Sequence, residues 1–340
     1  MTTRKHVNIA VIGAGSWGSA LAFALARNEH KVQLWARSAD HVADMKAHNC
    51  NRRYLSDFPF PENLTVTDDL ASLVDKHTVF LVSVPSHSFR NIIQQLKALG
   101  ISDNSTIIWA TKGFDKGDIE QGPMLLNRVI EQELGASVKK AIISGPSFSK
   151  EVAANLPTAM TCASDTIETA NEVAQLFHAE RMRIYTNEDL IGVQVGGAIK
   201  NVMAIAAGIS DGLGFGANSR SAIITRGLSE ISRLGVALGA KQTSFQGLAG
   251  MGDLILTCTD NQSRNRRFGL GLGKGQTVQD VLDEIGQEVE GYTTAFEVIR
   301  LAKHIGIEMP ISQQVYNVIY ENLSPNDAVN WLLNRDLSSE

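Results

Sequence analysis

The chain is poor in cysteine and has no excess of positive charge. Cys50, Cys162 and Cys258 are odd in number and far apart, so they form neither a disulfide framework nor a zinc-type spacing. None of the eight histidines forms an H-x-x-x-H or H-x-x-H pair, so we expect no metal and no zinc-dependent chemistry. The formal net charge of −5 argues against nucleic acids and anionic membranes as partners.

Long hydrophobic runs are also scarce near the N-terminus. The apolar stretch Val7–Ile12 is broken at once by glycine, so it is too short for a signal-peptide core or a membrane span. Together with the cysteine pattern, this predicts a soluble cytoplasmic protein without membrane insertion. The 340 residues, 44% of them hydrophobic, can bury one large core or two, and two domains are the expectation.

That apolar stretch leads directly into a glycine-rich turn. Gly13, Gly15 and Gly18 have the G-x-G-x-x-G spacing, and an Ala- and Leu-rich helix is predicted over Ser16–Glu29. In a strand-turn-helix unit these glycines permit a tight turn, a close approach to pyrophosphate and close helix packing. The anion then binds the free N–H groups at the start of the helix. The pattern predicts a dinucleotide site, the alternative being a tight turn without ligand.

The end of the next strand indicates which dinucleotide binds. An NAD site usually places Asp or Glu about 20 residues after the fingerprint, to bind the ribose hydroxyl. After the strand Lys31–Trp35 this chain instead has Ala36-Arg37-Ser38. A guanidinium can bind a 2′-phosphate in bidentate fashion, so Arg37 favours NADPH over NADH. A solvated surface arginine is the alternative.

The first half of the chain alternates between strands and helices. This pattern predicts an α/β fold with a Rossmann-like, doubly wound, mostly parallel sheet. Further strands are predicted at Leu64–Thr67, Thr78–Val84, Thr106–Thr111, Ala141–Ser144, Thr158–Cys162 and Met182–Tyr185. The predicted helices between them include Ser86–Leu99, Pro123–Leu134 and Thr166–Phe177. In such sheets, ligands bind at the carboxyl ends of the strands, where Thr111-Lys112-Gly113 and Ser144-Gly145-Pro146-Ser147 lie.

From about Glu188 the strand signals fade and helical patterns take over. We therefore predict a dinucleotide-binding domain over residues 1–190 and an all-helical C-terminal domain, for substrate binding and catalysis, over residues 191–340. The pattern from Val193 to Ile209 has almost no polar face, as expected of a buried central helix. Its exception is Lys200. Desolvation there would lower its pKa toward a value useful for proton transfer, unless the side chain extends to water.

Two further clusters follow this helix. Asp253 ends a glycine-rich stretch at Gly247–Gly252, where it could pair with Lys200, accept a substrate hydroxyl or simply cap a helix. The basic run Ser263–Arg267 is either a solvated face or a phosphate site. The glycine run Gly269–Gly275 lacks the strand and the ending of a P-loop, so we predict a loop there.

These segments together resemble the bacterial, soluble type of NAD(P)-dependent glycerol-3-phosphate dehydrogenase over nearly the whole chain. The resemblance is carried by Gly13–Gly18, Thr111–Gly113, Ser144–Ser147, Gly197–Asn201, Gly250–Leu254 and Ser263–Asn265. It implies NADH- or NADPH-dependent reduction of dihydroxyacetone phosphate to sn-glycerol 3-phosphate, for glycerophospholipid synthesis. It also implies a cytoplasmic homodimer or a similar oligomer.

The resemblance assigns a role to each matching residue. Lys200 would be the catalytic proton donor and also touch the substrate. The cofactor-binding residues would be Gly13, Gly15, Ser16, Trp17, Gly18, Arg37, Lys112, Ser149, Arg264, Val289 and Glu290. The other substrate-binding residues would be Lys112, Gly145, Ser147, Asp253, Ser263, Arg264 and Asn265. Ser147 and Ser149 depart from the Thr and Ala of many relatives, which affects the cofactor contacts more than the reaction.

Two other functions stay open at this stage. A related dehydrogenase of the 6-phosphogluconate or β-hydroxyacid type would have a similar architecture, although the basic cluster and the Gly-Met-Gly-Asp turn disfavour a β-hydroxyacid. A nucleotide-sensing regulator without catalysis would leave Lys200 and Asp253 unexplained.

Overall fold

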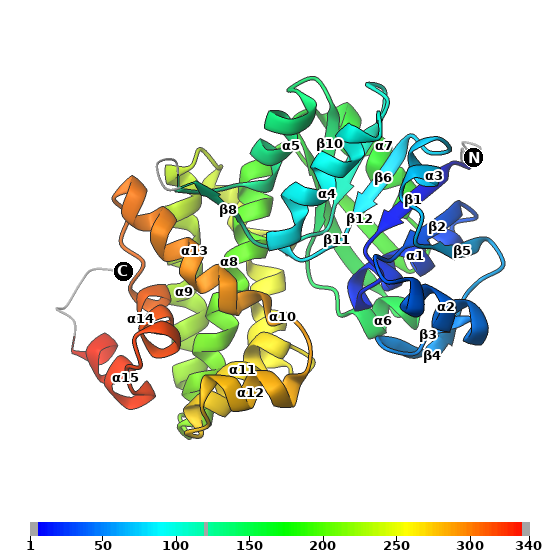
Figure 1. Ribbon diagram of the computed structural model, residues 1–340. Helices are drawn as coiled ribbons and strands as arrows, with labels where there is room; N and C mark the ends of the chain where they lie inside the picture. The colour runs from blue at the N-terminus through cyan, green and yellow to red at the C-terminus, as the bar shows by residue number, and fades with distance from the viewer. Residues whose placement is uncertain (1–5, 119–121, 335–340) are drawn as a thin grey trace. The chain divides into compact units, whose positions relative to one another are not determined.

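A computed structural model describes residues 6–118 and 122–334. Contacts between Cα atoms divide the chain into two compact units. The first, the sheet unit, comprises residues 1–111 and 126–190, and the second, the helical unit, comprises residues 112–125 and 191–340. Figure 1 labels most of the elements of both units.

The sheet unit is built on eight strands in the order β12-β11-β10-β7-β6-β1-β2-β5. The strands are β1 Asn8–Ile12, β2 Lys31–Trp35, β5 Leu64–Thr67, β6 Val79–Val82, β7 Thr106–Trp109, β10 Lys139–Ser144, β11 Thr158–Ser164 and β12 Met182–Asn187. The strands from β10 to β5 run parallel to one another, whereas β11 pairs antiparallel with β10, and β12 follows β11 in parallel. The predicted mostly parallel sheet is confirmed, with a reversal at one edge that the sequence analysis did not foresee.

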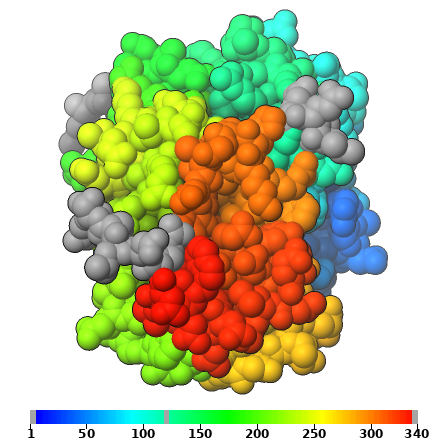
Figure 2. All heavy atoms as spheres, turned by 90° about the vertical axis from the view of Figure 1, so that its left-hand side faces the viewer, coloured from blue at the N-terminus to red at the C-terminus, as the bar shows by residue number. Residues whose placement is uncertain are grey.

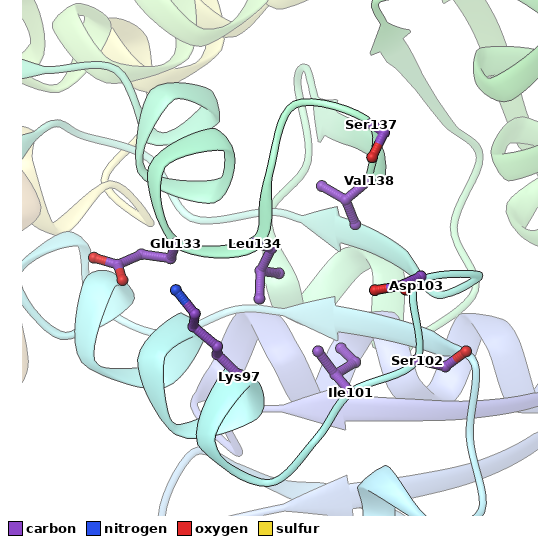
Figure 3. Close-up of a pocket in the computed structure, with 8 residues that line it drawn as sticks. All are labelled: Lys97, Ile101, Ser102, Asp103, Glu133, Leu134, Ser137 and Val138. Carbon is purple, nitrogen blue, oxygen red and sulfur yellow. The ribbon is translucent and has the colours of Figure 1, made fainter.

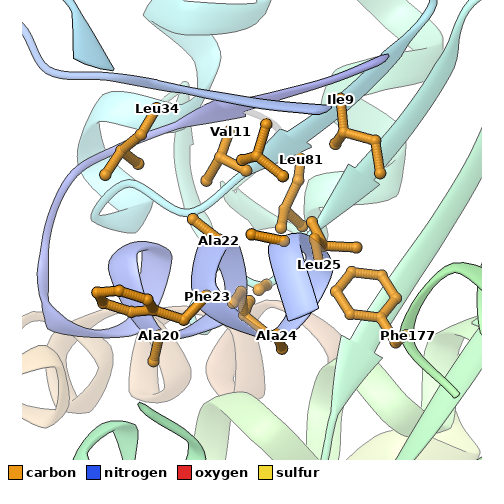
Figure 4. Close-up of a cluster of buried hydrophobic side chains, with 14 of the residues drawn as sticks. Ile9, Val11, Ala20, Ala22, Phe23, Ala24, Leu25, Leu34, Leu81 and Phe177 are labelled. Atoms are coloured by element: carbon orange, nitrogen blue, oxygen red, sulfur yellow. The ribbon is translucent and has the colours of Figure 1, made fainter. Parts of the chain in front are cut away.

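Helices and a small hairpin complete this unit. The helices are α1 Ser16–Arg27, α2 Ala39–His48, α3 Ala71–Val74, α4 Ser86–Ala98, α5 Leu126–Leu134, α6 Ser149–Ala153 and α7 Ile167–Phe177, and the hairpin pairs β3 Cys50–Asn51 with β4 Leu55–Pro59. Helix α1 packs Ala22 and Leu25 against the strand residues Val11, Leu34 and Leu81, as Figure 4 shows. On another side of the helix, Phe23 contacts the rings of Phe58 and Phe60. Because side chains alternate between the faces of a strand, the burial of Phe80 beside Leu81 shows that both faces of the sheet are covered.

The helical unit is organised around the long helix α8. Its elements are α8 Leu190–Gly212, α9 Ala217–Ala237, a 3₁₀ turn at Gln242–Gln246, a π turn at Leu248–Gly252, α10 Asp253–Thr259, α11 Arg264–Gly273, α12 Val278–Ile285, α13 Glu290–Ile305, α14 Pro310–Tyr320 and α15 Pro325–Leu333. Figure 2 shows the C-terminal helices, in orange and red, covering one face of this unit. Helix α8 is long and apolar enough to span a membrane, but 94% of its most apolar window is buried in the protein. It is therefore a core helix, as the sequence analysis predicted.

The contacts of residues 112–125 assign them to a different unit from the one that the sequence analysis expected. The sequence analysis placed them in the first domain, but Phe114 and Leu125 are buried in the core of the helical unit. Within this segment, β8 Asp115–Asp118 pairs with β9 Gly122–Met124. That pairing also explains why α5 begins at Leu126 and not at the predicted Pro123.

The predicted loop at Gly269–Gly275 is wrong, because α11 continues through Gly273. A Cβ atom at Gly269 would lie 2.0 Å from the carbonyl oxygen of Ile205, and one at Gly273 would lie 2.4 Å from that of Ile209. On the facing helix α8, Gly208 and Gly212 lie equally close to the backbone of α11. The glycines therefore permit two helices to touch backbone to backbone.

Candidate active site

The glycine turn of the sheet unit has the geometry that a dinucleotide requires. Gly13 has φ +113°, and a Cβ there would lie 2.4 Å from the carbonyl oxygen of Ser83. At Gly18 a Cβ would lie 1.9 Å from the carbonyl oxygen of Gly13, so this glycine permits α1 to begin close to the turn. The space beside Gly15 is open, since apart from Gly15 and its two chain neighbours no described residue has an atom within 4 Å of a Cβ built there.

The first turn of α1 is also available to an anion. Gly15 is the N-cap residue, and no side chain caps the helix. The indole Nε1 of Trp17 is buried and has no hydrogen-bond partner among the residues that the structure describes. Open space at Gly15, uncapped N–H groups and a free buried donor fit the pyrophosphate of a dinucleotide. The assignment of Ser16 and Trp17 to the cofactor stays a prediction.

Arg37 lies in the connection between β2 and α2. Trp35 ends β2, Ala36 is buried, and Arg37 is exposed. Ser38 then caps α2 by accepting a hydrogen bond from the backbone N–H of His41 at 3.3 Å. Within residues 6–118 and 122–334 the guanidinium of Arg37 has no hydrogen-bond or ion-pair partner, so it is free to bind a phosphate.

A second turn follows strand β10, which β7 and β6 separate from β1 in the sheet. Gly145 has φ +136°, and the hydroxyl of Ser147 donates to the carbonyl oxygen of Gly145 at 2.9 Å. Ser149 is the first residue of α6. This turn is at the same edge of the sheet as Gly13, because β10 and β1 run in the same direction.

The helical unit contains a buried cluster of charges. Asp253, at the start of α10, is only 1% exposed and forms ion pairs with both Lys200 of α8 and Lys112. The Lys112 Nζ lies 2.8 Å from Asp253 Oδ2, while Lys200 Nζ donates to Oδ1 of the same carboxylate and to Thr257 Oγ1 at 2.8 Å. The predicted pairing of Asp253 with Lys200 is confirmed. The sequence contains no sign of the Lys112 pairing, because these residues are 141 positions apart.

Burial and neighbouring charges tune the three groups differently. Burial is the largest influence on Lys200 and, with the nearby Lys112 cation, lowers its pKa to about 8 against the opposing pull of Asp253. Burial would also lower the pKa of Lys112, but the carboxylates of Asp253 and Glu290 raise it above its usual value. Burial alone would raise the pKa of Asp253, yet the two ammonium groups hold it below its usual range. The cluster thus has one firm cation, one firm anion and one lysine able to exchange a proton near neutral pH.

A chain of amides connects other predicted residues. Asn201, next to Lys200, donates to Glu290 Oε2 at 3.1 Å and accepts a hydrogen bond from Asn265 Nδ2 at 3.0 Å. Asn265 in turn accepts the backbone N–H of Gly291 at 2.8 Å. The structure therefore brings Asn265 and Glu290 to the same side chain on α8. Val289 is the buried N-cap residue of α13.

The basic run consists of side chains with different surroundings. Ser263 caps α11 by accepting a hydrogen bond from the backbone N–H of Arg266 at 3.2 Å. Arg266 is buried, where it bonds to Asp211, to Asn261 and to the carbonyl oxygen of Cys258. Arg267 is exposed. Arg264 is half-buried and has no polar partner within the described part of the chain, so its guanidinium is available to a ligand.

One small pocket lies away from all these residues. Its volume is about 180 Å³, and Figure 3 shows its lining by side chains that include Lys97, Asp103 and Val138. Asp103 precedes β7 and Val138 precedes β10, so the pocket is at the amino ends of the strands. Ligand sites are usually about 300–1,000 Å³ and lie at the carboxyl ends in such folds. This pocket is therefore not the candidate active site.

A dinucleotide-type turn on a parallel sheet, followed by a helical unit with a buried lysine, defines a class of two-part NAD(P)-linked oxidoreductases. Comparison with known proteins narrows this class. The family model for the N-terminus of NAD-dependent glycerol-3-phosphate dehydrogenase matches residues 8–170, and that for the C-terminus matches residues 189–330. The chain belongs to the NAD-dependent glycerol-3-phosphate dehydrogenase family.

Individual relatives cover nearly the whole chain. A glycerol-3-phosphate dehydrogenase (NAD(P)+) of Pseudoalteromonas translucida is 51% identical over 333 residues, 98% of either chain. A crystal structure of glycerol-3-phosphate dehydrogenase from Coxiella burnetii has 48% identity and a TM-score of 0.93, covering 97% of this chain and 99% of that one. A structure of D-mandelate dehydrogenase with NADH shares only 14% identity at a TM-score of 0.61, a likeness of fold alone.

Proposed function

We propose that this protein catalyses the reversible reduction of dihydroxyacetone phosphate to sn-glycerol 3-phosphate with NADPH or NADH. The main support is the buried Lys200–Asp253–Lys112 cluster in a chain of this family. A ketone needs a proton donor at its oxygen, and Lys200 is a buried ammonium whose pKa of about 8 suits this role.

In the reduction, Lys200 Nζ holds the proton that the C2 carbonyl oxygen of the substrate receives. The bound dihydronicotinamide supplies the hydride. As negative charge develops on the carbonyl oxygen, the Lys200 ammonium stabilises it and then gives up its proton. Asp253 and the Thr257 hydroxyl orient the ammonium, and Lys112 keeps Asp253 ionised. In the oxidation, the Lys200 amine is the base.

The substrate phosphate is bound by the start of α11. Ser263, Arg264 and Asn265 supply a hydroxyl, a guanidinium without a polar partner among the described residues and an amide. Such a group of donors matches the oxygens of a phosphate. Gly145 and Ser147 are further substrate-binding residues of the proposal.

The dinucleotide is bound by the glycine turn at Gly13–Gly18 and by Arg37. The other cofactor residues of the proposal are Lys112, Ser149, Arg264, Val289 and Glu290. Arg37 is exposed, and its guanidinium has no partner in the described part of the chain, which supports a preference for NADPH, whose 2′-phosphate it can bind. The protein functions as a cytoplasmic homodimer, and its product supplies glycerophospholipid synthesis.

The test is the loss of absorbance at 340 nm when the purified protein is mixed with NADPH and dihydroxyacetone phosphate. We expect turnover with this substrate and none with 6-phosphogluconate or an unphosphorylated β-hydroxyacid. Oxidation of 6-phosphogluconate or of a β-hydroxyacid with NADP⁺ would instead indicate a dehydrogenase of the 6-phosphogluconate or β-hydroxyacid type. Binding of NADPH without any turnover would indicate a nucleotide sensor.

A further inference from the structure

The segment that carries Lys112 is bent sharply just after this residue. Gly113 has φ +134°, a conformation that glycine adopts without strain. Phe114 follows and is fully buried in the core of the helical unit. The Lys112 ammonium therefore reaches Asp253 from a backbone that is fixed two residues further on.

Helix α13 holds this backbone through a buried carboxyl group. The backbone amide of Phe114 hydrogen-bonds to Glu297, which is only 6% exposed. Among the described residues, nothing bonds to the second oxygen of this carboxyl group, Oε2. The charged and titratable groups around Glu297 are Asp115, Arg300 and Tyr320.

These surroundings favour the neutral acid. Burial, the largest influence, together with the nearby Asp115, raises the pKa of Glu297 to about 8, although the Phe114 amide and Arg300 act in the opposite direction. A neutral carboxyl group retains a carbonyl oxygen that can accept the Phe114 N–H. The neutral carboxyl group of Glu297 also adds no negative charge near Lys112. Glu297 can thus anchor the segment without competing with Asp253 for the lysine.

We propose that Glu297 is a positioning residue, which holds Lys112 against Asp253 through the Phe114 amide and so sets the proton affinity of Lys200. The geometric link has two steps. Glu297 fixes Phe114, and the neighbouring Lys112 occupies one oxygen of Asp253 while Lys200 occupies the other. The Lys112 cation is one of the influences that lower the pKa of Lys200. If Lys112 moves away, Asp253 attracts Lys200 alone, and the pKa of Lys200 must rise.

The test follows the ionisation of Lys200 in the protein without substrate or cofactor. Lysine labelled with ¹³C at Cε gives an NMR signal whose shift reports the charge of the ammonium, and Lys200→Met assigns the signal. The charged and titratable groups that face this ammonium are Lys112, Asp253 and Cys258, and none of them is substituted in these variants. Glu297→Met removes the acceptor but keeps the volume, and Glu297→Gln keeps the acceptor without a titrating proton.

We expect Glu297→Met to raise the pKa of Lys200 by about one unit or more, the scale of a nearby charge. Glu297→Gln should titrate like the parent. Glu230→Met is the matched control, because Glu230 is also a buried acid of the helical unit that accepts backbone amides, those of Ile311 and Ser312, but has no link to Lys112. It should lower stability and leave the Lys200 titration unchanged.

An unchanged Lys200 titration in folded Glu297→Met would overturn the proposal. So would a raised pKa in Glu297→Gln, which remains decisive if the methionine variant does not fold. The inference rests on the proposed function for a second readout, the pH profile of kcat for dihydroxyacetone phosphate reduction. In Glu297→Met, the fall of kcat at alkaline pH should shift upward together with the pKa of Lys200. The NMR titration needs no turnover, so an inactive protein with the expected titrations would contradict the proposed function alone.

Discussion

At the level of single residues, burial and partners distinguish cations that look equivalent in the sequence. Arg266 has all its nitrogens engaged, whereas Arg264, two positions earlier, keeps its guanidinium unpartnered within the part of the chain described. Lys200 is likewise distinguished from the surface lysines by a carboxylate and a hydroxyl in the interior. A buried or half-buried charge with room for one more partner is the feature that we expect of a ligand-binding residue here.

Replacing Lys200 should abolish most of the chemistry. Lys200→Met removes the proton donor and the cation beside the developing oxyanion, so kcat should fall by a factor of about 10² to 10⁴. Binding of NADPH, measured by fluorescence titration, should survive. Lys274→Met, an exposed lysine of the same unit, is the control and should keep the parent rate. A kcat for Lys200→Met within about tenfold of the parent, or ~1.4 kcal/mol in barrier height, would rule out the proposed proton donor.

The pH dependence should have opposite signs in the two directions. Reduction requires Lys200 as an ammonium, so its rate should fall as the pH rises through about 8, the pKa of this group. Oxidation requires the free amine, so its rate should rise over the same range. Profiles of kcat for both reactions between pH 6 and 10 provide the measurement, and two limbs of the same sign would contradict the assignment.

Arg264 should be needed for the phosphate and not for the ketone. Arg264→Ala should weaken binding of dihydroxyacetone phosphate by about 1.5–3 kcal/mol, the scale of hydrogen bonds to charged groups. Turnover of unphosphorylated dihydroxyacetone should hardly change, and Arg267→Ala, at an exposed neighbour, should be silent. KM and kcat for both substrates test this expectation. An equal loss for both substrates would assign Arg264 to the cofactor or to structure.

Arg37 should discriminate between the two cofactors. Arg37→Asp should raise KM for NADPH much more than KM for NADH, because the new carboxylate repels the 2′-phosphate. The control is Arg181→Asp, which changes an exposed arginine beside β12, at the opposite edge of the sheet. If both cofactors were affected equally by Arg37→Asp, the residue would not read the 2′-phosphate.

At the scale of elements, the contact between α8 and α11 depends on four glycines. Gly208 and Gly212 face Gly269 and Gly273, each pair four residues apart and therefore on one side of its helix. Close packing of this kind fixes Arg264, at the start of α11, relative to Lys200 on α8. Backbone contact replaces the usual interlocking of larger side chains.

One methyl group should therefore be enough to disturb this pair. Alanine is favoured over glycine inside helices by about 1 kcal/mol, but at Gly269 its Cβ would overlap the Ile205 carbonyl oxygen. We expect Gly269→Ala to lower the free energy of unfolding by about 1–3 kcal/mol. At Gly247 a Cβ would meet only the Ser244 carbonyl oxygen, at 3.6 Å, so Gly247→Ala should be neutral or stabilise by up to about 1 kcal/mol. Urea unfolding of both variants decides the matter, and a stabilised Gly269→Ala would show that the helices can separate.

The same elements show what sequence patterns can and cannot predict. Runs such as Val79–Val82 and the almost uniformly apolar α8 were predictable because local hydrophobic periodicity dictates them. The helical conformation at Gly269–Gly273 was not, since glycine is a poor helix former and only the facing helix explains its presence. The contact of Lys112 with Asp253 and that of Glu297 with Phe114 could not be predicted for a similar reason. Their contacts connect distant parts of the chain and leave no local pattern.

At the scale of the whole molecule, the helical unit is discontinuous in sequence. It includes residues 112–125, which interrupt the sheet unit in sequence. This segment contains the buried Phe114 and Leu125 and also Lys112, one of the two lysines bonded to Asp253. The chain therefore passes between the units three times. Neither unit corresponds to a simple half of the sequence.

A fragment of residues 191–340 should consequently be unstable. Burying Phe114 and Leu125 is worth roughly 1.5–3 kcal/mol each, a large share of the 5–15 kcal/mol of a typical domain. We expect a fragment with residues 112–125 attached by a flexible Gly/Ser linker to be more stable than the bare fragment by about 3 kcal/mol or more. Urea unfolding followed by circular dichroism compares the two. Equal midpoints would mean that the segment adds nothing to the helical core.

The discontinuous unit also matters while the protein is being made. Residues 112–125 leave the ribosome before Ile191, and at about 5–20 residues per second the helices that receive Phe114 follow only after several seconds. During this interval β7 can pair with β10, and residues 112–125, which connect these strands, then form a loop that is not part of the sheet. Charged residues at Asp115, Lys116 and Asp118 favour the hydration of this loop. Nascent chains should therefore bury Phe114 late, after the sheet has closed.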